Sequence, residues 1–202
     1  MGKRSKRPLY ISQLNCEVLL QTLRCVIRHG DKHKEVRVLL DPGSQRSYIL
    51  DSTAVQLGLQ PRGETKLCHL LFGGAQEVQL HKLYGAEIES NGYHSQLKLL
   101  GHQRLCGGIP KMAKGPWMAE LKEKRIFVND LGEDRGEVEV LIGSDYYAHW
   151  LTGKKCSLQN GLVALETHFG WTLSGRLKEA TNENESSAVS MTVTSMCLSF
   201  GS

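Results

Sequence analysis

The sequence lacks the patterns that mark the commonest metal-binding and disulfide-rich proteins. None of its six cysteines is spaced C-x-x-C from another, and no cysteine pair precedes paired histidines at zinc-finger spacing. No zinc knuckle or finger is therefore expected, and no metal or other cofactor. Cysteines scattered along 202 residues are typical of free thiols in a reducing compartment, which predicts an intracellular, cytoplasmic protein. The six are Cys16, Cys25, Cys68, Cys106, Cys156 and Cys197.

Long apolar segments are also missing. No apolar stretch follows the basic cluster at residues 3–7, as a signal peptide requires, and no run approaches the roughly 20 apolar residues of a membrane span. We expect no membrane partner. The basic cluster also fits a nuclear address or a phosphate-binding arm, but a solvated, disordered leader explains it more simply. A net charge of +4 is too small to indicate a nucleic-acid binder, and no clear nucleic-acid site is expected.

Three common catalytic motifs are absent: G-x-S-x-G, G-x-x-x-x-G-K-[ST] and H-E-x-x-H. The eight histidines are scattered along the sequence, so each is expected at the surface or in packing and not as a ligand. The chain therefore shows no signature of a serine hydrolase, a P-loop nucleotidase or a zinc protease.

Strand patterns dominate what is present. Val36, Val38 and Leu40 alternate with their neighbours, which predicts one core-facing side for a strand ending at Leu40. Asp51-Ser52-Thr53 before an apolar run that ends at Gly58 predicts a capped short helix. Further helices are expected at residues 118–124 and 144–151. Strands are expected at residues 17–27, 34–40, 66–72, 77–88, 93–100, 125–128, 137–142, 162–167 and 171–173.

This pattern predicts a mainly β fold, namely a small closed β-barrel with a few short helices. We expect three parts in the chain: a basic disordered leader over residues 1–11, one folded domain over residues 12–177, and a polar disordered tail over residues 178–202.

The most informative segment is an apolar strand that runs into Asp41, followed by Pro42, Gly43 and Ser44. Asp-Pro-Gly by itself makes a good turn, and this simple explanation would suffice for an isolated motif. Two further features follow this segment along the chain, and their order adds to the signal. A double-glycine hairpin follows at residues 72–75, and then an apolar strand meets a glycine and a helix start at residues 140–147.

With these blocks the sequence resembles the retropepsin family, most closely the protease-like domain of BEL/Pao-type retrotransposon polyproteins. That family has an apolar run followed by Asp-Ser-Gly-Ser-Gln-Arg-Ser-Phe-Ile, and this chain has Asp-Pro-Gly-Ser-Gln-Arg-Ser-Tyr-Ile at residues 41–49. Its Leu-Ile-Gly-x-Asp-Tyr-Tyr block resembles residues 141–147, and its closing block resembles residues 162–167 with 170–175. The resemblance covers about residues 14–177.

The resemblance implies an aspartic endopeptidase that acts as a homodimer on an extended peptide or polyprotein substrate. Asp41 would be the catalytic carboxylate, paired with Asp41 of a second chain, the two sharing one proton. Ser144 and Asp145 are expected to cap the following helix, a structural role that we prefer to a catalytic one for Asp145. The implied site further comprises an active-site and substrate-binding loop (Pro42, Gly43, Ser44), a flap (Phe72, Gly73, Gly74) and residues packed beneath the loop (Ile142, Gly143).

One position departs from the family. Pro42 stands where the family has Ser or Thr, whose hydroxyl forms a hydrogen bond across the dimer. Proline has neither a hydroxyl nor an N–H, and losing such a buried bond costs roughly 1–3 kcal/mol per unsatisfied group. Pro42 therefore favours an alternative from another class: a catalytically inactive, degenerate or domesticated domain that serves as a dimerisation or peptide-binding module.

Overall fold

The structure is a computed structural model that describes residues 18–70, 76–107, 109–110, 115, 117–132, 135–177 and 196–198. The predicted leader at residues 1–11 and the predicted flap residues Phe72, Gly73 and Gly74 lie outside the described residues. So does most of the predicted tail, of which residues 196–198 form a strand paired antiparallel with residues 68–70.

The described chain is mainly β, with three short helices, as the sequence predicts. The strands of the barrel and of its projecting hairpin are β2 (Thr22–His29), β3 (Lys32–Leu40), β4 (Tyr48–Leu50), β5 (Gly63–Leu70), β6 (Gln76–Ser90), β7 (Tyr93–His102) and β10 (Val140–Ile142). The other strands are β1 (Val18–Leu19), β8 (Ile109–Pro110), β9 (Arg135–Gly136), β11 (Leu151–Ser157), β12 (Val163–Thr167), β13 (Gly170–Arg176) and β14 (Met196–Leu198). The helices are α1 (Asp51–Leu57), α2 (Trp117–Glu123) and α3 (Ser144–Trp150).

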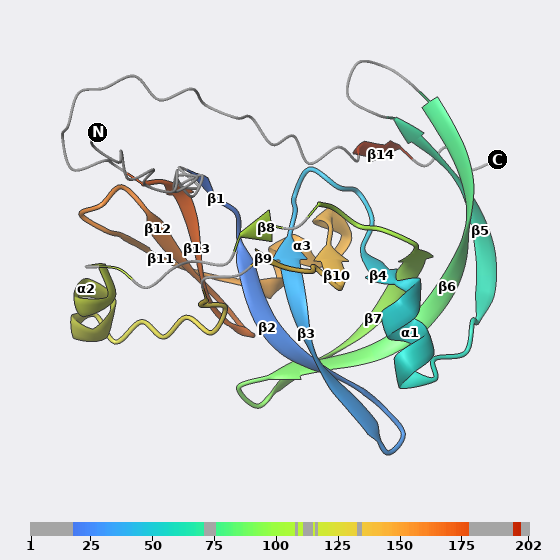
Figure 1. The fold of residues 1–202 in the computed structure, drawn as a ribbon, viewed down its shortest axis with the longest axis horizontal. Helices are drawn as coiled ribbons and strands as arrows, with labels where there is room; N and C mark the ends of the chain where they lie inside the picture. The colour runs from blue at the N-terminus through green and yellow to red at the C-terminus, as the bar shows by residue number, and fades with distance from the viewer. Residues whose placement is uncertain are drawn as a thin grey trace, which may run out of the picture.

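Six strands close a barrel, in the order β6-β2-β3-β10-β4-β7 with β7 pairing back onto β6 (Figure 1). Most neighbours are antiparallel, but β10 runs parallel to β3 and β4 runs parallel to β7. The core-facing side expected before Asp41 is observed, since Val36, Val38 and Leu40 all belong to the buried core inside the barrel, although Arg37 and Leu39 are buried as well. Burying such apolar side chains contributes roughly 1.5–3 kcal/mol each, which makes the barrel core the main source of stability.

A long hairpin projects from the barrel. The ladder between β5 and β6 runs from the pair of Gly63 with Leu83 to the pair of Leu70 with Gln76. Strand β6 pairs with β7 only through its residues from Leu83 to Ser90. Strand β5 and residues 76–82 of β6 therefore extend beyond the barrel wall, as the green strands of Figure 1 show. Residues 71–75, which connect β5 to β6 in the sequence, lie outside the described residues.

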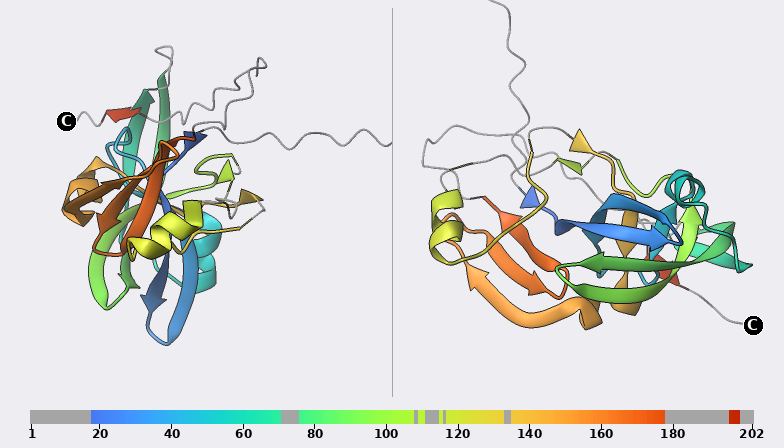
Figure 2. Two further views of the ribbon diagram at one scale, coloured as in Figure 1. Left: turned by 90° about the vertical axis from the view of Figure 1, so that its left-hand side faces the viewer. Right: turned by 90° about the horizontal axis from the view of Figure 1, so that it is seen from below.

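A second sheet flanks the barrel, with strand order β1-β13-β12-β11. Figure 2 shows this sheet to one side of the barrel, with α2 beside it. Its own apolar cluster includes Leu121 of α2, together with Leu162, Ala164 and Leu173. The predicted single β domain is therefore a barrel extended by a small sheet and helix layer.

Three local predictions need correction. The helix expected at residues 144–151 ends at Trp150, and β11, which was not predicted, begins at Leu151. Strand β11 lies at the edge of its sheet with most side chains at least partly exposed, so it lacks the alternation that reveals a strand. The strand expected at residues 125–128 is reduced to one bridge between Val128 and Trp171.

The third correction concerns the capped start predicted for α1. Leu50 occupies the N-cap position, and no side-chain cap hydrogen bond is seen at this described helix. Gly58 ends the helix with a left-handed φ of 70°, as predicted. None of the helices among the described residues has the length and apolar character that a membrane crossing requires.

Candidate functional site

Asp41 lies where β3 leaves the barrel wall. Its N–H donates to the carbonyl oxygen of Ile142 at 2.9 Å, which continues the parallel pairing of β3 with β10 by one more residue. The N–H of Ser44 donates to the Asp41 carbonyl oxygen at 3.1 Å and closes a turn around Pro42 and Gly43. Asp41 is half-buried, whereas Pro42 and Gly43 are exposed. The carboxylate therefore has a fixed backbone beneath it and solvent on one side.

Both carboxylate oxygens of Asp41 accept hydrogen bonds from its own loop. The Gly43 N–H donates to Oδ1 at 3.0 Å, and the Ser44 hydroxyl donates to Oδ2 at 2.9 Å. Ser44 is fully buried, so this hydroxyl is held in place by the surrounding structure. A Cβ on Gly43 would lie 3.2 Å from Asp41 Oδ1, a tight contact that favours glycine there. The loop thus orients the carboxylate within a single chain.

Gly143 lies directly beneath this loop. A Cβ on Gly143 would be 2.7 Å from the Ser44 carbonyl oxygen and closer still to that of Arg46. Both neighbours are backbone atoms, so a side chain at residue 143 would displace the loop itself. The Gly143 N–H donates to the Ser47 hydroxyl at 2.9 Å, which fixes the far end of the loop. Ile142 and Gly143 therefore lie where the sequence predicted, packed under the Asp41 segment.

Ser144 and Asp145 bind the loop, contrary to the prediction that they cap α3. The Ser144 N–H donates to the Ser44 carbonyl oxygen at 2.7 Å, and its hydroxyl donates to the Pro42 carbonyl oxygen at 2.6 Å. Asp145 accepts from Ser47, at 3.1 Å from the N–H and at 2.6 Å from the hydroxyl. The residue at the N-cap of α3 is Gly143. The capping prediction was wrong because these side chains face a loop about 100 residues away in the sequence.

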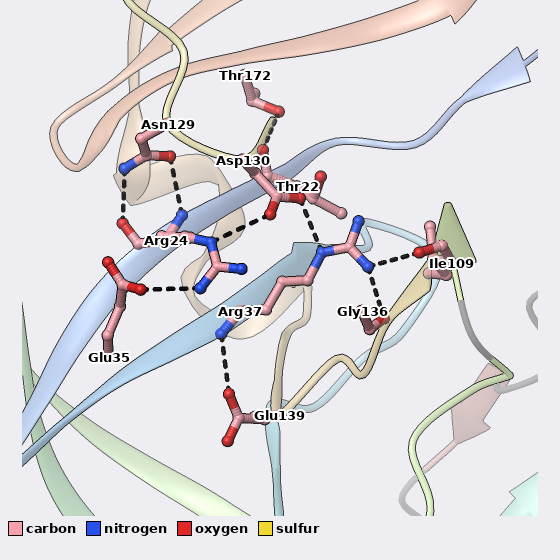
Figure 3. A network of polar contacts seen from close by, with 10 residues as sticks. All are labelled: Thr22, Arg24, Glu35, Arg37, Ile109, Asn129, Asp130, Gly136, Glu139 and Thr172. Carbon is pink, nitrogen blue, oxygen red and sulfur yellow. Dashed lines mark hydrogen bonds and ion pairs between the residues drawn. The ribbon is translucent and has the colours of Figure 1, made fainter. Parts of the chain in front are cut away.

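A buried ion pair supports the strand that carries Asp41 (Figure 3). Arg37 of β3 donates through Nε to Asp130 Oδ2 at 2.8 Å, and both side chains are 2% exposed. Its Nη1 donates to the carbonyl oxygens of Ile109 at 2.6 Å and Gly136 at 2.7 Å. Arg24 joins from β2, with Nε 3.5 Å from Asp130 Oδ1.

This network was not predicted from the sequence. Arg37 occupies the outward side of β3, which strand alternation predicts to be solvated. Ile109, Asp130 and Gly136 cover that side instead, and Arg37 ties β8, β9 and the Asp130 segment to the barrel. Breaking a buried pair by removing one partner typically costs about 3–5 kcal/mol, because the other charge stays buried.

Three of the histidines that are scattered along the sequence are brought together by the fold. His69, His81 and His102 meet where the hairpin leaves the barrel, with ring centroids 4.9–6.2 Å apart. No sequence pattern indicated this cluster, because the three belong to three different strands. Across the described ranges, no group of three or more His, Cys, Asp or Glu side chains has an arrangement that could hold a metal ion.

Comparison with known proteins assigns no family to the chain. No protein-family model matches the chain, and no curated protein matches it. The retropepsin resemblance stays a prediction carried by the residues quoted above.

Proposed function

We propose that this chain is an aspartic endopeptidase that cleaves extended peptide segments, such as sites within a polyprotein, as a homodimer. The observation that carries the proposal is the Asp41 carboxylate at the end of a closed-barrel strand. It is half-buried, and its two oxygens are oriented by Gly43 and Ser44. A carboxylate held in this way is suited to exchanging protons with a bound water.

The proposed reaction uses one Asp41 from each of two chains. Two carboxylates brought close together cannot both ionise and so share a proton. The ionised one removes a proton from water, which attacks the scissile carbonyl carbon. The protonated one donates a hydrogen bond to the carbonyl oxygen. Asp145 is assigned a structural part instead, because its carboxylate joins the start of α3 to the far end of the Asp41 loop through Ser47.

The hairpin of β5 and β6 would cover the peptide. Its strands extend past the barrel wall, and in the sequence the predicted flap residues Phe72, Gly73 and Gly74 stand between β5 and β6. A peptide in extended form would bind by main-chain hydrogen bonds between the hairpin and the Asp41 loop. Closure of the hairpin would then exclude water from the reacting groups.

A second candidate function is a non-catalytic dimerisation or peptide-binding module. Pro42 favours it, because proline removes the hydroxyl and the N–H at this position. The Pro42 carbonyl oxygen is instead bound by Ser144 of the same chain. The loop is therefore held within one chain, and its conformation does not require a partner chain.

The decisive test is peptide-library cleavage in mild acid, at about pH 4–6, with and without pepstatin, since a pair of close carboxylates acts with one proton shared between them. We expect cleavage that pepstatin blocks and that Asp41→Asn abolishes. Sedimentation across a concentration series gives the dimer fraction, and the cleavage rate per chain should rise with that fraction. Equal rates for the parent and Asp41→Asn would remove the enzyme proposal and leave the binding module.

Pro42→Ser separates the two candidates further. In a weakened enzyme, two restored bonds at roughly 1 kcal/mol each would strengthen dimerisation by about a factor of thirty. Cleavage at low concentration should rise with it, and the double variant with Asp41→Asn should be inactive. A binding module would show a small change in stability and no cleavage. Full activity in the parent with no gain from serine would show that the cross-dimer hydroxyl is unimportant here.

A further inference from the structure

The projecting hairpin carries a strand from the far end of the chain. Met196–Leu198 (β14) pair antiparallel with Leu70, His69 and Cys68 of β5, which are distant in the sequence. Figure 1 shows β14 beside the hairpin, at the end of the barrel where the loop between β3 and β4 carries Asp41. The proposed reaction gives no part to β14. Main-chain pairing therefore holds a C-terminal segment on the hairpin that is proposed to cover a peptide.

Strand β14 occupies only part of the β5 edge. Strand β5 has 8 residues, and β14 pairs with three of them. Within the described part of the chain, no strand pairs with the outer side of residues 63–67. The pairs between β5 and β6 follow one another without a register shift, so the edge of β5 is regular. Unpaired N–H and C=O groups along a regular edge are a template for a further strand.

The edges of the second sheet are less suited to pairing. At β11 the register with β12 shifts between Leu151 and Lys155, and Gly153 has a left-handed φ of 86°. Lys154 and Lys155 are exposed, and bulges and lysines keep an edge strand from pairing. Strand β1, at the opposite edge, is two residues long. Strand β5 has an exposed lysine, Lys66, but neither a register shift nor a proline, so among these edges it is the best template.

The chemistry of such an edge selects an extended peptide. An added strand is bound through its own N–H and C=O groups, so affinity depends mainly on the peptide main chain. The exposed side chains on β5 include one of each charge, Glu64 and Lys66, which gives no preference for a charged peptide of either sign. A proline in the peptide removes a donor and disfavours pairing. The edge therefore fits an extended segment without proline.

We propose that the outer edge of β5 is a strand-addition site for an extended peptide, and that residues 196–198 occupy it in cis as a competitor. A peptide that binds in trans must displace β14, because both need the same main-chain groups of residues 68–70. The consequence for catalysis rests on the proposed peptidase activity. A substrate held by the hairpin would bind more weakly to the intact chain than to a chain whose C-terminal strand cannot pair.

Prolines in β14 test the competition in the full chain. The N–H groups of consecutive residues in a strand point to opposite sides, so one of residues 196 and 197 must face β5. Met196→Pro combined with Cys197→Pro removes both donors and should abolish the pairing. Met196→Ala combined with Cys197→Ala is the matched control, because alanine keeps both N–H groups.

The probe is a fluorescent synthetic peptide with the sequence of residues 192–202, kept reduced, and its binding is followed by anisotropy. It should bind the double-proline chain about tenfold more tightly than the parent or the double-alanine chain, which corresponds to about one net main-chain hydrogen bond. Equal affinity for the double-proline and double-alanine chains would overturn the proposal, as would no binding to the double-proline chain. The same peptide with prolines at both positions should not bind, and its binding would also overturn the proposal.

A measurement on the parent covers the case in which the double-proline chain does not fold. Amides of residues 196–198 that face β5 should be protected from hydrogen exchange, and a saturating excess of unlabelled peptide should remove that protection. Unprotected amides in the parent would refute the in-cis strand. Protection that the peptide leaves unchanged would refute the competition.

Cleavage kinetics separate this proposal from the proposed function. In an active enzyme, the KM for an extended peptide should be about tenfold lower in the double-proline chain than in the double-alanine chain, with kcat unchanged, because the competitor affects binding alone. Equal KM values would refute competition with the substrate. Peptide binding as expected, without cleavage by any version of the chain, would refute the proposed peptidase and leave the strand-addition site standing.

Discussion

Gly143→Ala tests whether the Asp41 loop is held from below by backbone contact. The new methyl group would lie 2.7 Å from the Ser44 carbonyl oxygen and nearer still to that of Arg46, so the loop would have to move. Overpacking of this kind costs roughly 1–3 kcal/mol. The shift would also weaken the hydrogen bond from the Gly143 N–H to Ser47, worth roughly 1 kcal/mol.

The expected loss in the free energy of unfolding is therefore about 3 kcal/mol, or a fall in Tm of about 6–12 °C for a domain of this size. Urea unfolding and calorimetry measure it. Gly107→Ala is the matched control, because a Cβ there meets nothing within 4 Å. Peptidase activity, once detected in the parent, should fall by about a hundredfold in Gly143→Ala, since a displacement near 1 Å suffices for that loss. Equal stability of the two alanine variants would show that the loop is not supported through Gly143.

Further predictions concern the Arg37–Asp130 ion pair, the hydrogen bonds of the Ser47 hydroxyl and one buried thiol. Arg37→Met should lower the free energy of unfolding by about 3–5 kcal/mol, because Asp130 stays buried without its main partner. Adding Asp130→Leu should recover part of that loss. Additive effects of the two substitutions in urea unfolding would refute the coupling. Ser47→Ala removes hydrogen bonds to Asp145 and Gly143 and should lower the free energy of unfolding by about 2–3 kcal/mol in urea. A loss below about 0.5 kcal/mol would show that these hydrogen bonds do not stabilise the loop. Burial raises the pKa of Cys25, so native protein treated with iodoacetamide should remain unlabelled at Cys25 in peptide mapping while the partly exposed Cys156 is labelled; equal labelling would contradict the buried position.

Much of the local structure followed from sequence patterns. Alternating residues 36–40 identified β3 and its buried face, and Gly58 identified the end of α1, because both signals depend on neighbouring residues alone. The position of Asp41 at the end of a barrel strand was predicted in the same way. Its proposed role as a catalytic carboxylate stays a prediction, since it depends on a partner chain.

At the Asp41 loop, the sequence predicted some of the contacts and not others. The resemblance predicted that Gly143 packs beneath the loop that contains Gly43. The structure gives a physical reason for each glycine, since a Cβ on Gly43 would meet Asp41 Oδ1 and a Cβ on Gly143 would meet the loop backbone. The role of Asp145 was mistaken, because helix capping is a local rule and its actual partner, Ser47, is distant in the sequence.

The sequence by itself determined the strand alternation, the turns and the apolar strand that ends at Asp41. Only the tertiary structure decided which outward-facing residues are covered and which side chains meet. Arg37 is buried because Ile109, Asp130 and Gly136 lie over its strand. His69, His81 and His102 meet although the β5–β6 ladder pairs His69 with Glu77 and His81 with Thr65. Alternation reports the direction of a side chain relative to its own strand, whereas burial and contact depend on how distant segments pair.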